Sequence, residues 1–262
     1  MDTLILKLIL TPALIGGASL AGRRWGPAVS GWLVGLPLTS APIAVFLALE
    51  QGPAFAASAA VGTMEGAISQ AAFCLAYGWL AFHGGRLPAI AMSVLAFALA
   101  TALLERVTLP LPALFLVVIA GLGAALWLMP ARRAGIGAAS APPPAWDIPA
   151  RMMVATVFVL LLTGVASTLG PRLTGLLAPF PVYAAILAIF AHHLQGPAAA
   201  TSVLKGLLLG LFGFAGFFLV FAGLVEAVGI VSAVAMATAV TLACQAAALW
   251  ALRRGEASRS PR

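Results

Sequence analysis

The chain has 262 residues, of which 63% are hydrophobic and only 8% are charged, and its formal net charge is +7. Apolar runs of about 20 residues follow one another along most of its length, which excludes a water-soluble globular protein and indicates a polytopic membrane protein. Backbone groups in hydrocarbon must be hydrogen-bonded internally, and the runs are too long and too unalternating for barrel strands. The predicted fold is therefore an all-α bundle in a lipid bilayer.

Nine transmembrane helices are predicted in chain order. They cover residues 3–22, 28–49, 54–82, 87–104, 108–129, 149–169, 173–194, 198–225 and 228–252. The first of these has the length of a signal peptide, but it lacks a basic segment before it and is followed by two arginines, Arg23 and Arg24. We therefore expect it to be retained as a membrane helix.

The arginines predict the orientation of these helices. With the N-terminus outside and the C-terminus in the cytoplasm, ten arginines lie on the cytoplasmic side and only Arg106 and Arg172 lie in loops opposite. Arginine outnumbers lysine twelve to two, which fits a GC-rich bacterial genome and so the bacterial inner membrane. The positive charge is expected to favour anionic lipid headgroups, and no nucleic-acid partner is predicted.

An internal duplication organises the sequence. The segment 26–75 recurs at 170–219, a constant offset of 144 residues, with 19 of 50 positions identical. Five predicted helices separate the start of one copy from the start of the other, so the copies are expected to cross the membrane in opposite directions. The predicted plan is an inverted 4+1+4 repeat. Its parts are a first four-helix repeat (1–107), a linking helix with a cytoplasmic Pro-rich linker (108–148), a second, inverted four-helix repeat (149–252) and a basic cytoplasmic tail (253–262).

Prolines interrupt the second predicted helix of each copy near its middle. Each proline removes one helical hydrogen bond and clashes with the carbonyl group four residues before it. Interruptions at corresponding positions of two halves predict a binding site at the bilayer midplane, formed by freed carbonyl groups and half-helix ends. The predicted site residues there are Pro37, Thr39, Ser40, Pro42, Pro179, Pro181 and Tyr183. The alternative, which the sequence leaves open, is that the prolines only kink the helices.

Two charged residues fall inside predicted helices. Glu65 lies near the bilayer centre, where an ionised carboxylate is costly unless it is paired, hydrated or protonated. It is predicted to couple transport to protons or cations, to form half of a structural ion pair, or to lie beside a water-filled crevice. Lys205 lies one helical turn from the position that the repeat alignment makes equivalent to Glu65, and it is the candidate partner of Glu65 in such an ion pair. Lys7 and Arg151, which are equivalent in the two copies, are predicted to reach lipid headgroups.

Small residues predict where two of the helices approach each other. Gly62 and Gly66 in the first copy match Gly206 and Gly210 in the second. Glycines four residues apart permit close contact between membrane helices. We therefore expect the third helix of each copy to pack against the other near the axis that relates the copies.

Catalytic and cofactor motifs are absent from the sequence. It contains no glycine-rich phosphate loop, no H-E-x-x-H, no G-x-S-x-G and no C-x-x-C, and Cys74 and Cys244 form no motif. We therefore predict no enzyme activity, no cofactor and no metal site.

Inverted repeats are typical of secondary transporters, because two similar halves of opposite polarity give two conformations of similar energy. The predicted function is an inner-membrane secondary transporter for a small solute or ion, coupled to protons through Glu65. The alternatives are a channel and a non-transport accessory or assembly protein. If the protein has the accessory role, its expected partners also include a second copy of the chain, in a homodimer, or another membrane component.

Two short segments, Gly35-Leu-Pro37-Leu-Thr39-Ser40 and Leu173-Thr-Gly175-Leu-Leu-Ala-Pro179-Phe-Pro181, resemble the GlpM-like group of small, roughly four-helix bacterial membrane proteins. The resemblance implies that each half of the chain is one such unit and that the whole is a fused, inverted pair. That group is associated with exopolysaccharide production rather than with an established transport reaction, which favours the accessory alternative. Its pattern implies no catalytic residue in this chain.

Overall fold

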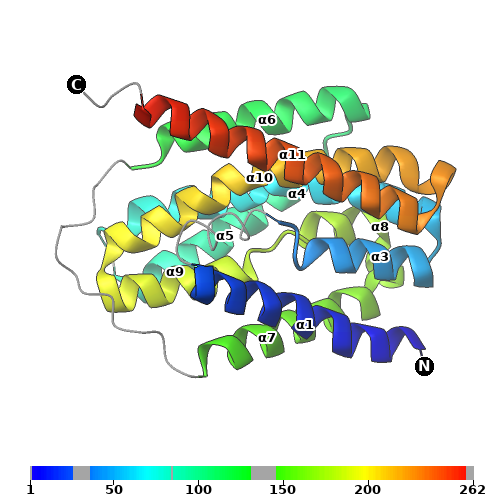
Figure 1. Ribbon diagram of the computed structural model, residues 1–262, viewed down its shortest axis with the longest axis horizontal. Coiled ribbons are helices and arrows are strands. Elements are labelled where there is room, and N and C mark those ends of the chain that lie inside the picture. Colours follow the sequence, from blue (N-terminus) through cyan, green and yellow to red (C-terminus); the bar gives the residue numbers. More distant parts are fainter. Residues whose placement is uncertain (1, 26–35, 84, 131–145, 258–262) are drawn as a thin grey trace.

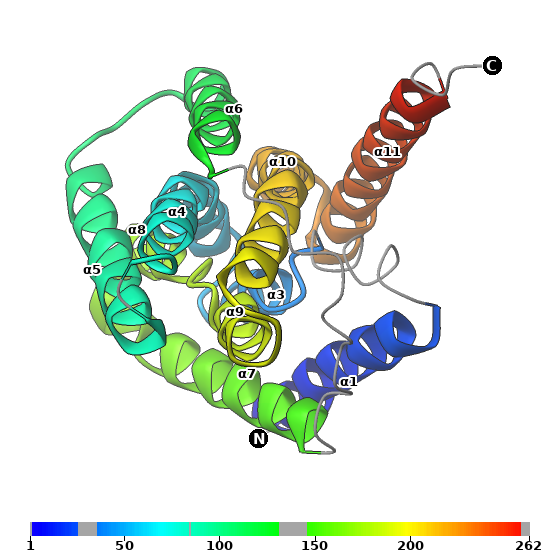
Figure 2. The same cartoon turned by 90° about the vertical axis from the view of Figure 1, so that its left-hand side faces the viewer.

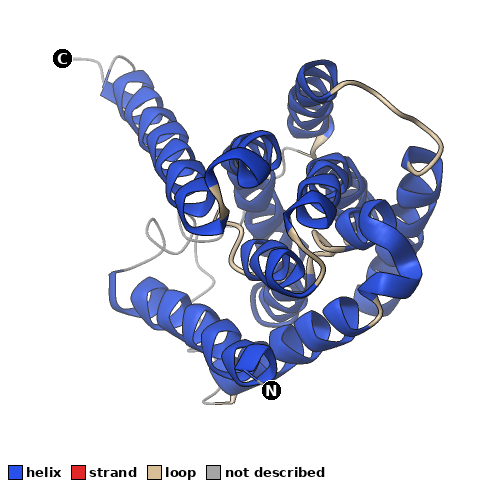
Figure 3. Cartoon of the chain, turned by 90° about the vertical axis from the view of Figure 1, so that its right-hand side faces the viewer, coloured by secondary structure: helices blue, strands red, loops and turns tan. Residues whose placement is uncertain are grey.

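The computed structural model describes residues 2–25, 36–83, 85–130 and 146–257, and all regular secondary structure in these ranges is helical (Figure 3). The helices are α1 (Asp2–Trp25), α3 (Ser40–Glu50), α4 (Pro53–Leu80), α5 (Arg86–Leu104), α6 (Leu111–Leu128), α7 (Asp147–Gly164), α8 (Ala166–Leu177), α9 (Val182–Gln195), α10 (Pro197–Val228) and α11 (Ile230–Ala257). The bounds of α1, α4, α5 and α6 follow the predicted ranges closely. The helix predicted over 149–169 instead ends at Gly164, and α8 begins at Ala166 within that range.

The helices run along the long axis of the molecule, with the start of α1 and the end of α11 toward opposite ends (Figure 1). Seen from one end, α4 and α10 lie inside the bundle, and α1, α5, α6, α7 and α11 lie around them (Figure 2). Among the described residues, five helices are long and apolar enough to cross a membrane: α1, α5, α6, α7 and α10. Outer helices also expose large apolar side chains, such as Leu103 and Leu116. This is the architecture of a helical membrane protein.

Glycines mark equivalent helix boundaries in the two copies. Gly52 and Gly196 have φ angles of 94° and 88°, and Gly85 and Gly229 have φ angles of 74° and 78°. Glycine adopts these positive values without the steric cost that a Cβ would impose. The members of each pair are 144 residues apart, and the helix after each glycine begins at its repeat equivalent: α4 and α10 after the first pair, α5 and α11 after the second.

The predicted helix 173–194 is interrupted as expected. Its first part belongs to α8, which is bent at Gly170 (φ 77°) and ends at Leu177, and its second part is α9. The prolines Pro179 and Pro181 lie between the two parts. In the first copy, α3 begins only at Ser40, while residues 28–35 of the predicted helix lie outside the described ranges. Arg172 was predicted to lie in a loop between two helices. That prediction is wrong, because Arg172 lies in a helical turn of α8.

Glycines allow the backbones of α4 and α8 to touch. A Cβ on Gly62 would lie 2.5 Å from the carbonyl oxygen of Arg172, and a Cβ on Gly66 would overlap the ring of Pro179. The predicted contact between α4 and α10 is present, but Gly62 and Gly66 face α8 instead. The glycines in α4 therefore serve to seat the half-helix before the second interruption.

Two basic residues that were predicted to reach headgroups are bound inside the protein. Lys7 Nζ lies 2.6 Å from Glu50 Oε1, and the Lys7 side chain is only 7% exposed. Arg151 Nη2 lies 2.6 Å from Asp147 Oδ1, one turn earlier in the same helix. The headgroup prediction is therefore wrong for both residues, because each meets a carboxylate within the fold.

Candidate functional site

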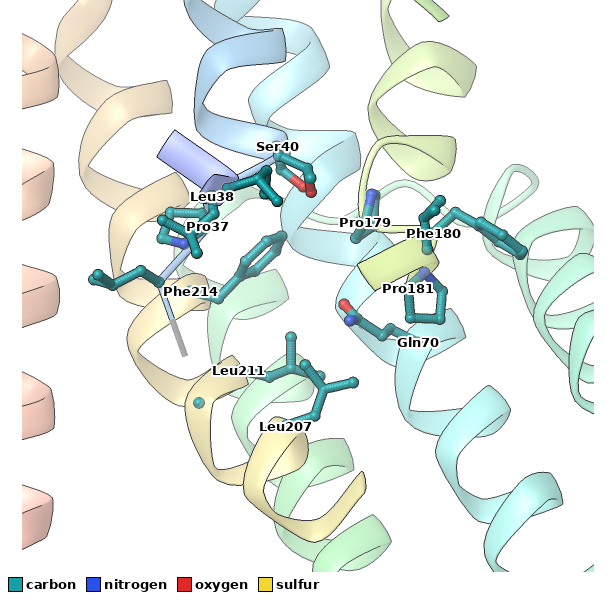
Figure 4. A pocket seen from close by; sticks show the side chains of 15 residues that line it. Pro37, Leu38, Ser40, Gln70, Pro179, Phe180, Pro181, Leu207, Leu211 and Phe214 are labelled. Atoms are coloured by element: carbon teal, nitrogen blue, oxygen red, sulfur yellow. The ribbon is translucent and has the colours of Figure 1, made fainter. Parts of the chain in front are cut away.

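A small cavity lies between the start of α3 and the interruption that separates α8 from α9 (Figure 4). Its walls include Pro37, Thr39 and Ser40 at the start of α3 and Pro179 and Pro181 from the interruption. Residues of α1, α4 and α10 close the remaining sides. Its volume is about 50 Å³, and one water needs about 10–15 Å³ on this measure, so the cavity holds a few waters or a small ion.

The walls of the cavity are related by the repeat. Four pairs of lining residues are 144 positions apart: Leu36 and Phe180, Pro37 and Pro181, Leu38 and Val182, and Gln70 and Phe214. The same positions of both copies thus face one space. The chemistry is unequal, however, because Gln70 contributes a carboxamide where its equivalent, Phe214, contributes an aromatic ring.

A hydrogen bond joins the start of α3 to the segment between α8 and α9. Ser40 Oγ, at the first residue of α3, donates to the carbonyl oxygen of Ala178 at 3.0 Å. Helices α3 and α9 both begin at the cavity, with Thr39 and Pro181 as the residues that precede them. A helix N-terminus carries a partial positive charge and unpaired backbone N–H groups. The cavity therefore receives the positive ends of two helices.

Gln70 is a buried polar side chain of this cavity whose carboxamide oxygen has no partner among the described residues. It lies in the middle of α4, is 6% exposed, and its Oε1 accepts no hydrogen bond from any described residue. Figure 4 shows its carboxamide reaching into the space from the wall opposite Pro37 and Phe214. An unpaired buried amide costs about 1–3 kcal/mol, so a water or ligand is expected to occupy this position.

Glu65 is bound by Arg172 rather than by Lys205. Its side chain is 2% exposed, and Arg172 Nη2 lies 3.1 Å from both carboxylate oxygens. The same guanidinium donates to the carbonyl oxygens of Leu104, at 2.9 Å, and of Val107. Arg172 thus joins α8 to α4 and to the end of α5.

The two flanks of the cavity are packed differently. Behind the second interruption, the ring of Phe180 packs against Phe73, Phe97 and Phe158, with centroid distances of 6.3, 5.1 and 6.2 Å. The repeat equivalents of these four residues are Leu36, Phe217, Thr241 and Leu14. All four line an apolar pocket of about 330 Å³ between α1, α3, α10 and α11. One flank is therefore filled by aromatic rings and the equivalent flank is hollow.

The predicted site residues are brought together only in part. The cavity gathers Pro37, Thr39, Ser40, Pro179 and Pro181. The other predicted residues lie elsewhere: Pro42 lines the apolar pocket, Glu65 binds Arg172, and Lys205 is half-buried on α10 with no ion pair among the described residues. The side chain of Tyr183 lies outside the described part of α9.

Sequence reasoning missed Gln70, Phe214 and Arg172. One property of the sequence could have identified Gln70, because it is a polar carboxamide inside a predicted membrane helix. No such property identified Arg172, because the Gly170-Pro171 step before it was interpreted as a loop between two long helices.

Comparison of the chain with protein-family models, with curated proteins and with solved structures gave no match in any of the three. The resemblance to the GlpM-like group therefore stays a prediction, and the functional argument depends on the geometry of the site.

Proposed function

We propose that this protein is a membrane carrier for a small solute or ion, with its binding site in the cavity between the two interrupted helices. The observation that carries the proposal is the pairing of the cavity walls: Leu36, Pro37, Leu38 and Gln70 face the equivalent residues of the other copy across one space. A site shared in this way between the copies of an inverted repeat is reached from either side by similar movements of either half.

The inverted, nine-helix plan of 4+1+4 helices is part of this proposal. Gly62 packs against Arg172 and Gly66 against Pro179, so α4 and α8 run in the same direction. In an inverted repeat, the third helix of one copy is parallel to the second helix of the other, whereas in a parallel duplication the two would be antiparallel. The pairs α4 with α5 and α10 with α11 also pack equivalently, and α6 contacts both α4 and α10. These contacts support inversion, with α6 as the linking helix.

The unequal flanks of the cavity support an alternating mechanism. A carrier with two similar halves occupies, at any one time, a conformation in which one half is packed more closely than the other. The ring of Phe180 fills one flank, while the equivalent flank beside Leu36 is hollow. Exchange of these two packings would change which side of the cavity is closed. Within this mechanism, Glu65 is the residue proposed to couple transport to protons.

The proposed orientation puts the N-terminus outside and the C-terminus in the cytoplasm of a bacterial inner membrane, on the basis of the arginine bias. Gln51 and Gln195 test it together with the inversion, because they are repeat equivalents and both are exposed. In a variant that lacks the exposed Cys244, we expect a cysteine at position 51 to react with a membrane-impermeant maleimide on intact spheroplasts. A cysteine at position 195 should react only after permeabilisation. Labelling of both positions from one side would contradict the inverted plan and favour a parallel duplication.

Transport itself is tested by uptake driven by a pH gradient into proteoliposomes, over a panel of small ions and metabolites. Leu207→Trp places a large ring in the cavity wall and is expected to abolish uptake. Leu99→Trp, on the exposed face of α5, is the matched control and should retain uptake. Absence of uptake over the whole panel, with both proteins folded, would contradict the carrier proposal and favour the accessory role.

A further inference from the structure

The chemistry of the cavity indicates the charge of its ligand. No acidic or basic side chain of the described residues lines it; the polar side chains in its walls are those of Thr39, Ser40 and Gln70. The Ser40 hydroxyl hydrogen is already donated to Ala178. The carboxamide of Gln70 makes no hydrogen bond to a described residue, and its oxygen and nitrogen positions are interchangeable by a flip. Gln70 can therefore present its NH₂ group to a ligand.

The helix ends around the cavity favour an anion over a cation. The N-termini of α3, with 11 residues, and of α9, with 14 residues, both face the cavity. A cation would instead need free carbonyl oxygens. Those at the end of α8 are occupied, because the carbonyls of Thr174 and Gly175 accept from the Ala178 amide, that of Leu177 accepts from Phe180, and that of Ala178 accepts from Ser40. The helix dipoles therefore act where these four carbonyl oxygens are already bonded, which favours a negative ligand.

The size and the apolar wall limit the ligand further. A volume of about 50 Å³ admits only a few heavy atoms. Leu207, Leu211 and Phe214 form the wall opposite the polar groups, and Figure 4 shows the ring of Phe214 and the carboxamide of Gln70 entering the space from different helices. An ion with a large hydration shell would have to lose most of it here, whereas a small, weakly hydrated anion loses less.

We propose that the cavity binds a small monovalent anion, such as chloride, nitrate or formate, between the Gln70 carboxamide and the N-termini of α3 and α9. This inference deepens the proposed carrier function and depends on it for the statement that the anion is transported. Binding itself depends only on the cavity. Anion recognition by backbone N–H groups at a helix N-terminus needs no cationic side chain.

The test is the broadening of the chloride NMR line by the purified protein in detergent, at constant ionic strength with gluconate as the replacing anion. We expect the wild-type protein to broaden the line, and nitrate and formate to remove the broadening by competition. Gln70→Leu should weaken the competition constant by about tenfold or more, since it removes a hydrogen bond to a charged ligand. Gln70→Glu, which keeps the shape of the side chain and adds negative charge, should abolish binding.

Gln245→Leu is the matched control, because Gln245 is also buried without a partner for its carboxamide but lies on α11 outside the cavity. It should leave chloride binding within about twofold of the wild type. Equal binding by wild type, Gln70→Leu and Gln70→Glu would overturn the inference, and so would a response of the sodium line with none of the chloride line. Chloride binding without uptake of any solute would overturn the carrier proposal alone. If the protein took up a neutral solute or a cation, and this uptake did not require Gln70, only the inference that the ligand is an anion would be overturned.

Discussion

Gly175→Ala is expected to destabilise the protein by about 3 kcal/mol or more, or to prevent its assembly. A Cβ at this position would overlap the carbonyl oxygen of Ala59 and lie 2.9 Å from the amide nitrogen of Thr63. Both atoms belong to the backbone of α4, so no side-chain rotation can relieve the clash. The only relief is to separate α8 from α4, which would also shift the second interruption and the cavity.

The measurement is thermal or denaturant unfolding in detergent, followed by circular dichroism and by elution as a monodisperse species. Gly123→Ala in α6 is the control, because a Cβ there meets nothing within 4 Å. In a helix interior this control should be neutral or slightly stabilising, since alanine has the higher helix propensity. Equal stability of Gly175→Ala and Gly123→Ala would show that α4 and α8 are not in backbone contact.

Arg172→Met is expected to cost about 3 kcal/mol of stability, because it leaves the Glu65 carboxylate buried without its partner. The carboxylate is 2% exposed, and Arg172 contacts both of its oxygens. Glu65→Gln should cost less, since the neutral amide oxygen still accepts from Arg172. The double variant should recover part of the loss, because it removes the unpaired charge.

A double-mutant cycle on unfolding free energies measures this coupling. Arg106→Met removes an exposed arginine near the same end of α5 and should change stability little. Additive effects of Arg172→Met and Glu65→Gln would contradict the ion pair.

The same variants separate the two roles proposed for Glu65. A folded Glu65→Gln protein that still exchanges solute across the membrane, but no longer responds to a pH gradient, would support proton coupling. Transport with an unchanged response to pH would leave Glu65 with the structural role alone, as the partner that holds Arg172. The ion pair with Arg172 makes this comparison necessary, because protonation of the carboxylate removes the negative charge that the guanidinium binds.

Much of the fold could be predicted from local properties of the sequence. Apolar runs set the helix ranges, since a backbone in hydrocarbon has no other partner than itself. Gly52 and Gly196, each followed by proline, marked helix boundaries through glycine's freedom at positive φ and proline's fit in a first helical turn. Pro179 and Pro181 predicted the interruption before α9 for an equally local reason, because proline lacks the N–H group that a continuous helix requires.

The candidate site could be predicted only in outline. The paired prolines predicted that the second helices of the two halves would face each other at one site, and in the described residues Ser40, at the start of α3, bonds to Ala178 beside the α8–α9 interruption. Lys205 was predicted as the partner of Glu65 because the repeat alignment placed it one helical turn away, and Arg172 was predicted to lie in a loop. The partner was decided instead by how far α8 extends before it breaks and by the side on which it meets α4.

The sequence by itself thus determined that this is a helical membrane protein, where several of its helices begin, and where one of them must break, because each of these depends on composition and on backbone chemistry within a few residues. Only the tertiary structure decided that Gln70 and Phe214 share one cavity, that Arg172 binds Glu65, and that Phe180 fills one flank while the equivalent flank stays hollow. These contacts depend on the rotation and crossing of helices far apart in the chain, which the spacing of residues along one helix does not specify.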